Sequence, residues 1–464
     1  MFADELKEIV GVNGIQGPDT VAGLDPGWHQ ENLSAGLVVL PVSADQVARV
    51  VAYCNRKDVS LVPHGGRTGL SGGGVSAPGA IVLQTTRMNR ILSIDPLAGT
   101  VIVEAGIVLE ALEAEVAKHN LSVGIDLGAR GTATIGGMVS TNAGGIEAFR
   151  NGMTRHHVLG LEVVLPDGQI LDDLKTVTKA NEGYDIKQLF IGAEGTLGVV
   201  TKVSLSLVPK KGRTATALVS CSGVDQAVRT FRHFRNHCDG TLLSAELMWP
   251  DYSRVTAAEL GHEPVLAFET DQQALFLILE VADKKGDGRV FLENLLSECA
   301  DKNEIRNAII AKSDREKKSI WQIREEPRIC ENRFPHGFWF DISVPLGELK
   351  NYTDKLFEDI PRIQPELKTL VFGHLGDGNL HITVTSGKVI SELKDPIRRA
   401  VYQNLNALAG SFSAEHGIGI DKRESLARYT SPEKLKIMRN IKKILDPKGI
   451  MNPGKVLATT TDES

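Results

Sequence analysis

Three runs of small, glycine-rich residues constrain the possible folds of this chain more than any other feature. The first, PHGGRTGLSGGG (63–74), follows the apolar segment VSLV, the second is GTATIGGMVSTNAGG (131–145), and the third is IGAEGTLGVVT (191–201). Backbone amides flanked by so little side-chain bulk can approach an anion closely. Three such runs in one region predict an extended, doubly charged ligand, of which a diphosphate is the natural example.

The first run does not fit the common nucleotide-binding motifs. It is not a GxxxxGK[ST] loop, and it lacks the GxGxxG that opens a dinucleotide-binding helix, so neither a P-loop nor a nicotinamide site is indicated. A flexible surface loop is the alternative interpretation of this run taken alone.

The segments around these runs indicate mixed helix and strand structure. VVLPVSADQVARVVAYCNRKDVSLVPHGG is typical of a strand, a helix that begins at Ser43 or Asp45, and a second strand, and LEVVLPDGQIL predicts a hairpin with a Pro-Asp-Gly turn. After Lys211 the glycine density falls and longer helical patterns alternate with strands. A chain of 464 residues is too long for one core, so we expect domains at 1–211 and 212–425 and a C-terminal segment at 426–464.

Charge and composition exclude several classes of protein. A net charge of -6 and a pI near 6.1 argue against nucleic acid as a partner. The first residues carry acids where a secretory signal needs basic residues, and no apolar run is long enough for a transmembrane segment, so we expect a cytoplasmic enzyme. Five cysteines without CxxC spacing indicate neither disulfides nor a thiolate zinc site.

A candidate metal site lies in two motifs of the second half. GHLGDGNLH places His374 and His381 around a Gly-Asp-Gly turn that can bring the two imidazoles together, and AEHGIG supplies Glu415 and His416. Adjacent extended residues point to opposite faces, so one of this last pair can bind metal while the other faces a substrate. Two histidines and one carboxylate leave a position open on a divalent ion; zinc fits best, with manganese or iron as alternatives.

Taken together, these motifs resemble the FAD-linked oxidases of the vanillyl-alcohol oxidase type, in the branch of the D-lactate, glycolate and D-2-hydroxyglutarate dehydrogenases. The resemblance covers nearly the whole chain. It implies an α+β fold: a two-part FAD-binding domain, an α/β substrate (cap) domain, and a C-terminal helical segment that returns to the FAD domain. The candidate cofactor-binding residues are Pro63, Gly65, Gly66, Arg67, Thr68, Gly69, Ser71, Gly136, Gly137, Thr141, Asn142, Gly144, Gly145, Glu194, Gly198 and Asn452.

Members of this family that link FAD covalently usually have a histidine inside the first glycine loop. Here Arg67 occupies the middle of that loop and His64 precedes the glycines, so noncovalent FAD is expected.

The resemblance also implies the roles of the residues in the second half. His374, His381 and Glu415 are the expected metal ligands, and His416 is the expected base that takes the proton of a substrate hydroxyl while hydride leaves C2 for the flavin. Arg324 is the expected anchor for the substrate carboxylate. The alternative is that Arg324 pairs with Glu325 or Glu326 on a solvated helix face.

Two positions depart from the pattern of D-2-hydroxyglutarate dehydrogenases. Trp339 stands where the members of that branch resemble one another in carrying a lysine. Thr383 stands where they tend to carry an asparagine. Burial of an unpaired second carboxylate would be costly, so D-lactate or a related small D-2-hydroxy acid is the expected substrate, with D-2-hydroxyglutarate as the alternative. Arg328, Arg333 or His336 could serve a dicarboxylate from another direction.

Other functions remain open from the sequence. A zinc hydrolase whose glycine loops bind phosphate is a remote alternative, and a noncatalytic flavoprotein subunit of a larger complex is another. The resemblance implies a quinone or an electron-transfer flavoprotein as the electron acceptor. A homodimer is expected only because dimers are common.

Overall fold

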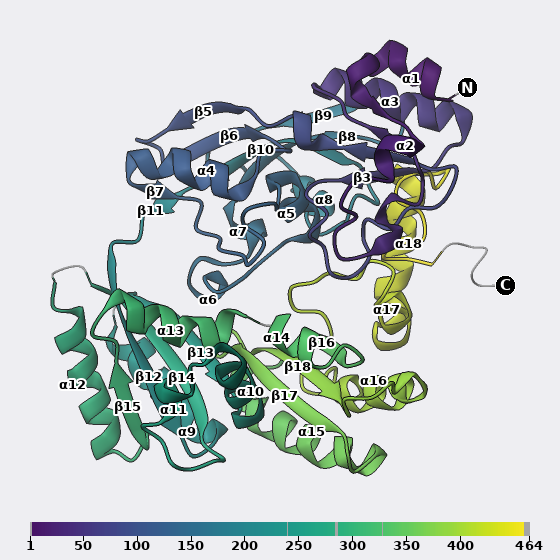
Figure 1. Cartoon of the computed structure of the whole chain (residues 1–464). Helices are drawn as coiled ribbons and strands as arrows, with labels where there is room; N and C mark the ends of the chain where they lie inside the picture. The colour runs from purple at the N-terminus through teal and green to yellow at the C-terminus, as the bar shows by residue number, and fades with distance from the viewer. Residues whose placement is uncertain (1, 239, 284–285, 327, 459–464) are drawn as a thin grey trace. The chain divides into compact units, whose positions relative to one another are not determined.

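The structure is a computed structural model that describes residues 2–238, 240–283, 286–326 and 328–458. Its contacts divide the chain into two units (Figure 1): residues 1–145, 151–210 and 415–464 form unit 1, and residues 146–150 and 211–414 form unit 2. The chain therefore returns to unit 1 at Glu415, whereas the sequence placed 212–425 in one domain. Met1 and residues 459–464, assigned from the sequence to the first domain and the C-terminal segment, lie outside the described residues.

Unit 1 contains two main sheets. The smaller has the order β1-β2-β4-β3, with β4 parallel to both β2 and β3, and the larger has the antiparallel order β5-β6-β10-β8-β9. A two-stranded ribbon pairs β7 with β11. The strands are β1 Ile15–Gln16, β2 Val38–Val39, β3 Leu61–His64, β4 Ile81–Gln84, β5 Ile91–Asp95, β6 Thr100–Glu104, β7 Leu121–Ser122, β8 Val158–Val164, β9 Ile170–Asp173, β10 Val199–Ser206 and β11 Val208–Pro209.

The helices of unit 1 come from both terminal regions of the chain. The C-terminal segment packs into the first core, because Leu61 donates to the Ile450 carbonyl and Met451 is buried with Leu61. The helices are α1 Phe2–Val10, α2 Pro18–Val21, α3 Ala44–Lys57, α4 Leu109–Val116, α5 Ile135–Thr141, α7 Thr154–His157, α8 Lys187–Phe190, α17 Arg423–Tyr429 and α18 Pro432–Leu445, with α6 Ala148–Asn151 beginning in unit 2.

Local sequence accounts for several of these elements. Ser43 caps α3 by accepting a hydrogen bond from the Gln46 amide, as one of the two predicted starts requires. The predicted hairpin joins β8 to β9, where the Leu165 amide donates to the Gln169 carbonyl and Gly168 has a φ of 91°. Short-range capping and turn chemistry thus fixes the ends of these elements.

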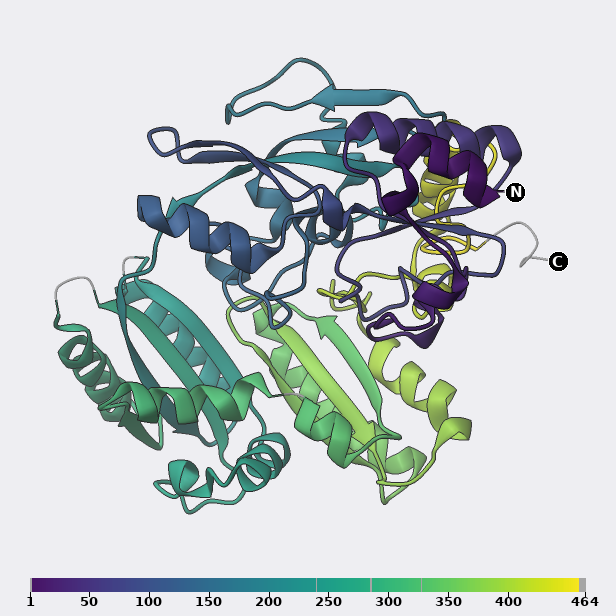
Figure 2. The same cartoon turned by 45° about the horizontal axis from the view of Figure 1, so that its top comes forward.

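Unit 2 is built on one seven-stranded antiparallel sheet with the order β15-β12-β14-β13-β17-β18-β16. Figures 1 and 2 show helices on both of its faces. On one face, α10, α13 and α14 cover a core that includes Met248, Ile278 and Phe372. We call this the site face. Helices α9, α12 and α15 contact one another or the strands and cover the other face.

The strands of unit 2 are β12 Arg213–Cys221, β13 Leu242–Met248, β14 Leu275–Asp283, β15 Asn307–Ile310, β16 Phe338–Ser343, β17 Lys368–His374 and β18 Asn379–Thr385. Its helices are α9 Val224–His237, α10 Pro250–Leu260, α11 Glu263–Leu266, α12 Gly288–Asp301, α13 Asp314–Glu325, α14 Arg328–Arg333, α15 Leu349–Ile363 and α16 Lys394–Tyr402. In the described parts of both units, no helix combines the length and apolarity needed to cross a membrane.

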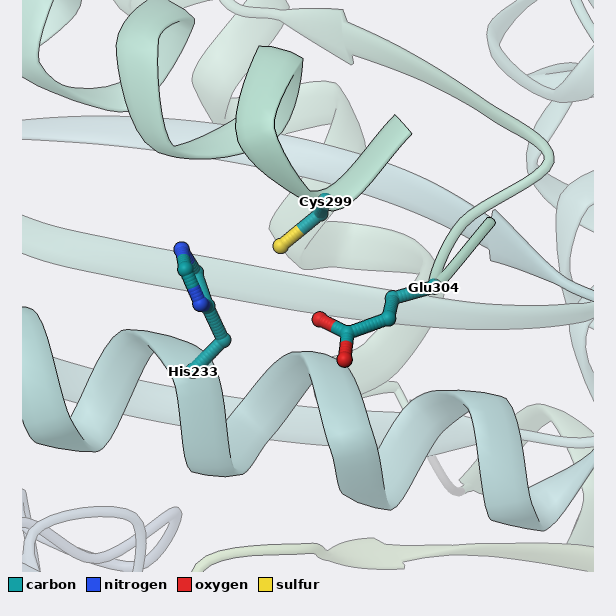
Figure 3. A group of neighbouring side chains, drawn as sticks. All are labelled: His233, Cys299 and Glu304. Carbon is teal, nitrogen blue, oxygen red and sulfur yellow. The ribbon is translucent and has the colours of Figure 1, made fainter. Parts of the chain in front are cut away.

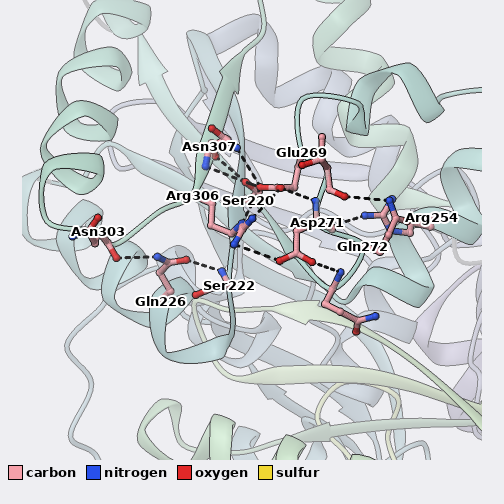
Figure 4. A network of polar contacts seen from close by, with 12 residues as sticks. Ser220, Ser222, Gln226, Arg254, Glu269, Asp271, Gln272, Asn303, Arg306 and Asn307 are labelled. Carbon is pink, nitrogen blue, oxygen red and sulfur yellow. Dashed lines mark hydrogen bonds and ion pairs between the residues drawn. The ribbon is translucent and has the colours of Figure 1, made fainter.

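A buried polar network closes one end of the unit 2 sheet (Figure 4). Glu269 accepts hydrogen bonds from the Ser220 hydroxyl at 2.7 Å and from Arg306 Nε at 3.1 Å, and it also receives the Asp271 amide. Burial favours the neutral carboxyl, but these donors and Asn307 outweigh it and lower the pKa of Glu269 to about 2. The network joins the loop before β14 to strands β12 and β15.

Candidate functional site

The first glycine run leaves β3 and is packed tightly against the second run. A Cβ atom on Gly66 would lie 1.9 Å from the Thr132 carbonyl oxygen, so only glycine allows this approach. A Cβ atom on Gly69 would meet no atom within 4 Å. One side of the loop is therefore fixed by packing, and at Gly69 it is open.

Asn452 connects the C-terminal segment to the first and third runs. Its side-chain amide donates to the carbonyls of Gly73 at 2.9 Å and Glu194 at 2.7 Å, and its backbone amide donates to Leu61. The Glu194 carboxylate accepts the amides of Ile418 and Gly419 at 2.7 and 2.8 Å. Segments far apart in the sequence thus converge around these two side chains.

Four of the predicted cofactor residues have unusual backbone conformations. Arg67, Asn142, Glu194 and Asn452 all have positive φ, between 42° and 55°. Such conformations are strained for residues other than glycine and are common where a backbone must present itself to a ligand. The Arg67 guanidinium itself donates to the Asp25 carbonyl and to Gln84, each at 2.9 Å, so its side chain is already engaged within the unit.

Three buried acceptor atoms near the first run have no hydrogen-bond partner among the described residues: Oδ1 of Asn32, Nδ1 of His64 and Oδ1 of Asn452. Burial lowers the pKa of His64 to about 4, so its ring is neutral, and Nε2 must be the protonated nitrogen because it donates to the Gly74 carbonyl at 2.8 Å. FAD carries hydroxyl and N–H groups that can donate hydrogen bonds to such acceptors. The residues present therefore fit this cofactor.

The remaining predicted cofactor residues lie in the same unit. Thr141 donates to the Gly137 carbonyl within α5, and the Asn142 side chain accepts the Arg155 amide. A Cβ atom on Gly198 would press on Val163 and Val164, so its smallness is explained by strand packing. All of the predicted positions, from Pro63 to Asn452, belong to unit 1.

The predicted metal motif lies on the site face of unit 2. His374 ends β17 and pairs with Asn379, and His381 lies on the neighbouring β18, so the two rings face one another with centroids 5.6 Å apart. Gly378 makes this turn possible, because it has a φ of 76° and a Cβ atom there would lie 2.0 Å from the Val344 carbonyl oxygen. Turn geometry and strand register together bring the two imidazoles to the same place.

Two buried carboxylates orient these rings. Glu246 on β13 accepts a hydrogen bond from His374 Nδ1 at 2.9 Å, which leaves Nε2 of that ring with its lone pair. Asp341 on β16 lies with Oδ1 3.9 Å from His381 Nδ1 and accepts hydrogen bonds from Asn379 and from the Ala414 amide. Both carboxylates are 1% exposed.

Glu415 and His416 directly follow Ala414 in the chain. Of the predicted ligand set, His374 and His381 belong to unit 2, whereas Glu415, like His416, belongs to unit 1. Imidazole and carboxylate groups are ligands that zinc accepts.

Arg324 reaches the same cluster from α13. Its Nη2 lies 2.7 Å from Glu246 Oε2, its guanidinium stacks 4.6 Å above the Phe372 ring, and only 5% of the residue is exposed. This burial does not fit the alternative of a solvated helix face. Nη2 also lies 3.4 Å from Nε2 of His374, and Nε is buried without a hydrogen-bond partner among the described residues.

Sequence reasoning missed Glu246 and Asp341. Each is a single carboxylate in an otherwise apolar strand, in LLSAELM and FWFDIS. An isolated charge in a buried strand needs a partner, and that signal could have marked both residues.

The comparisons with known proteins agree with this geometry. Residues 210–456 match the family described as FAD linked oxidases, C-terminal domain, and residues 35–173 match the FAD binding domain. The chain belongs to the FAD-linked oxidase family. The predicted fold class is confirmed, since the chain shares the fold of p-cresol methylhydroxylase with a TM-score of 0.75 at 15% identity, over 98% of this chain and 96% of that one.

Among the relatives, a D-2-hydroxyglutarate dehydrogenase of Bos taurus is 36% identical over 98% of this chain and 83% of its own length. A Schizosaccharomyces pombe protein, provisionally named a D-lactate dehydrogenase, is 32% identical over 97% of this chain and 89% of its own length. Both names include the word mitochondrial. The expectation of a cytoplasmic enzyme is therefore wrong, because acids among the first residues and the lack of a long apolar run do not report the compartment in which an enzyme works.

Proposed function

We propose that this chain is a FAD-dependent D-2-hydroxy acid dehydrogenase that uses a divalent metal ion to activate the substrate hydroxyl. The observation that carries the proposal is the facing pair of His374 and His381 beside the buried Arg324 guanidinium, in a chain that belongs to the FAD-linked oxidases. This membership favours a flavoenzyme over the zinc hydrolase that the ligand set alone would allow.

In this proposal each residue of the cluster has a separate task. His374, His381 and Glu415 hold the ion, for which zinc fits the ligand set, and a bound ion lowers the pKa of a coordinated hydroxyl. His416 accepts the hydroxyl proton. Bound FAD supplies the hydride acceptor, and the neutral His64 ring, already hydrogen-bonded to Gly74, supports noncovalent binding.

Arg324 is proposed to hold the substrate carboxylate. Its Nη2 lies close to both Glu246 and His374, and its unpartnered Nε gives it a further donor. A carboxylate held here would place the neighbouring hydroxyl near the ion. Glu246 holds the guanidinium and the His374 ring in position.

The substrate that these residues favour is D-lactate or a related small D-2-hydroxy acid. Trp339 pairs with Thr383, and strand alternation puts both on the same sheet face as Asp341 and His381. Neither side chain supplies a cation for a second carboxylate. D-2-hydroxyglutarate is the second candidate, favoured by the likeness to the bovine enzyme that is named for it.

The test is a titration of the purified protein with D-lactate, L-lactate and D-2-hydroxyglutarate, followed by flavin absorption. We expect a D-acid to bleach the flavin bands and a chelator to abolish this response. A colourless protein, or a full response after complete metal removal, would contradict the proposal. A higher kcat/KM for D-2-hydroxyglutarate than for D-lactate would replace the preferred substrate by the second candidate.

We also propose that the electrons pass to a quinone or an electron-transfer flavoprotein, and that the chain forms a homodimer. The five cysteines show no CxxC-type spacing for a second redox centre, which supports transfer directly from the flavin. Turnover of the isolated chain with an artificial acceptor tests whether it works alone or only as a subunit of a complex. Sedimentation analysis tests the dimer.

A further inference from the structure

A second group of potential metal ligands lies in unit 2, on the opposite face of the sheet from His374. It consists of His233 on α9, Cys299 on the last turn of α12, and Glu304 in the turn that follows α12. One ligand atom from each lies within 4.8 Å of the others. Figure 3 shows the three side chains pointing toward one another from these separate elements.

The ligand atoms of this group are buried, and one of them has no hydrogen-bond partner. His233 is 8% exposed and Cys299 is fully buried. Oε2 of Glu304 makes no hydrogen bond to any described residue, and His233 Nε2 has the Glu298 carboxylate 3.2 Å away. A buried carboxylate oxygen without a donor is costly, so its position requires an explanation.

A carboxylate of the same unit shows what a purely structural group looks like. Glu269 is buried, whereas Glu304 is half-buried, and donors from Ser220, Arg306 and Asn307 surround Glu269 (Figure 4). Glu304 has no such donors on Oε2, and its neighbours are an imidazole and a thiol. These are groups that bind metal ions.

The backbone holds Glu304 in place independently of its side chain. Thr230 on α9 donates to the Glu304 carbonyl at 2.6 Å, Gln226 donates to the Asn303 carbonyl at 2.8 Å, and the Glu304 amide donates to Cys299. Gln226, Thr230 and His233 share one face of α9. The turn is therefore preorganised with its carboxylate directed at His233 and Cys299.

We propose that His233, Cys299 and Glu304 form a second metal site, which binds a zinc-class divalent transition metal and joins α9 to the turn after α12. Imidazole, thiolate and carboxylate together suit zinc or cobalt, whereas calcium and magnesium require oxygen ligands. Tetrahedral zinc keeps its ligand atoms about 3.4 to 3.8 Å apart, so side-chain shifts of about 1 Å would complete the site. On binding, the Cys299 thiol releases its proton to solvent and its sulfur coordinates the ion.

An alternative set shares His233 but uses His237 and Glu298. That set is less suited to an ion, because Glu298 and His237 are exposed. Moreover, His237 Nδ1 already donates to the His233 carbonyl at 2.7 Å, and Glu298 lies 3.2 Å from His233 Nε2. The inner set also contains the only thiol among the proposed ligands, which gives it a spectroscopic signature of its own.

Burial, together with the Glu304 carboxylate, raises the pKa of the Cys299 thiol to about 12, so the thiol is neutral without metal. The sequence did not indicate Cys299 as a metal ligand, because the other two proposed ligands lie on other elements of the fold. The sequence contains no CxxC spacing to announce it.

The test uses the full-length flavoprotein, stripped of metal and titrated with Co²⁺. We expect near-ultraviolet thiolate-to-cobalt charge-transfer absorption that saturates at one cobalt per chain and disappears when Zn²⁺ is added. Cys299→Ala and His233→Ala should lose it, and the spectrum of Cys299→Ala at equal flavin content serves as the reference. Cys330→Ala, at another buried cysteine of unit 2, is the matched control and should keep it.

Absence of the band from the wild-type titration would overturn the second site even if no variant folds. A band that persists in Cys299→Ala would also overturn it. The proposed ligands of the first site include no sulfur, so this signal does not depend on whether the dehydrogenase proposal is correct.

Discussion

The two clusters on opposite faces of the unit 2 sheet differ in how their ligands are supported. On the site face, His374 and His381 come from one pair of adjacent strands, and Glu246 and Asp341 lie beside their Nδ1 atoms. On the other face, His233, Cys299 and Glu304 come from two helices and a turn, and Oε2 of Glu304 accepts no hydrogen bond from the described residues. The two clusters therefore differ in their supporting groups, because buried carboxylates lie beside both imidazoles of the first cluster, whereas the carboxylate beside His233 of the second, Glu298, is exposed.

The largest expected effect is a loss of enzymatic activity when a ligand on the site face is removed. Replacing His381 by alanine removes a ligand of the proposed catalytic ion, and we expect kcat/KM to fall by at least about a thousandfold, since such an ion contributes several kcal/mol to the transition state. His262→Ala, at a histidine of unit 2 outside both clusters, should keep activity near wild type. Steady-state kinetics with the preferred D-acid measures both, and equal losses in the two variants would remove the distinction.

A smaller effect should appear at the supporting carboxylates. Glu246→Gln should weaken metal binding by about 10- to 100-fold, because the partner of His374 Nδ1 and of Arg324 loses its charge. Glu280→Gln is the matched control. Glu280 lies on the same face of the sheet and contacts Trp321 and Lys317 of α13, the helix that carries Arg324. Competition with a chromogenic chelator gives both affinities. Indistinguishable affinities would show that Glu246 does not orient the ligand.

Stability against acid should distinguish a satisfied carboxylate from an unsatisfied one. The folded pKa of Glu269, about 2, lies below its ordinary value of 4.5, so its ionised form adds stability that is complete above about pH 4.5 and is lost as the pH falls toward 2. We expect Glu269→Gln to lower the free energy of unfolding near neutral pH by about 2 kcal/mol and to flatten this acid limb.

Glu304→Gln is the comparison for that measurement. Its Oε2 accepts no hydrogen bond from the described residues, so metal-free Glu304→Gln should cost less than Glu269→Gln at neutral pH. Denaturant unfolding at a series of pH values gives both quantities. An equal loss in both variants would mean that Glu304 is as well satisfied as Glu269.

The smallest effect concerns the thiols. Without metal, Cys299→Ala and Cys330→Ala should each change the free energy of unfolding by about 1 kcal/mol, as expected for small changes in a core. Added zinc should then stabilise the wild type and Cys330→Ala more than Cys299→Ala. Thermal unfolding with and without zinc measures the difference, and a gain that is the same for all three proteins would contradict a metal role for Cys299.

Local patterns in the sequence determined much of this protein. The Ser43 cap, the Pro-Asp-Gly hairpin, and the histidines that flank the Gly-Asp-Gly turn depend on neighbours within a few residues, so their geometry could be predicted. The family resemblance supplied the fold, and the comparisons confirmed it.

Only the tertiary structure decided which distant side chains meet. Glu246 reaches His374 because β13 pairs with β17, and Cys299 reaches His233 because α12 packs beside α9. Strand order and helix packing are set by the burial of whole faces, which depends on the sum of many contacts and not on any local motif. The sequence therefore determined where a turn or a cap forms, and the packed fold determined which charges and thiols became neighbours.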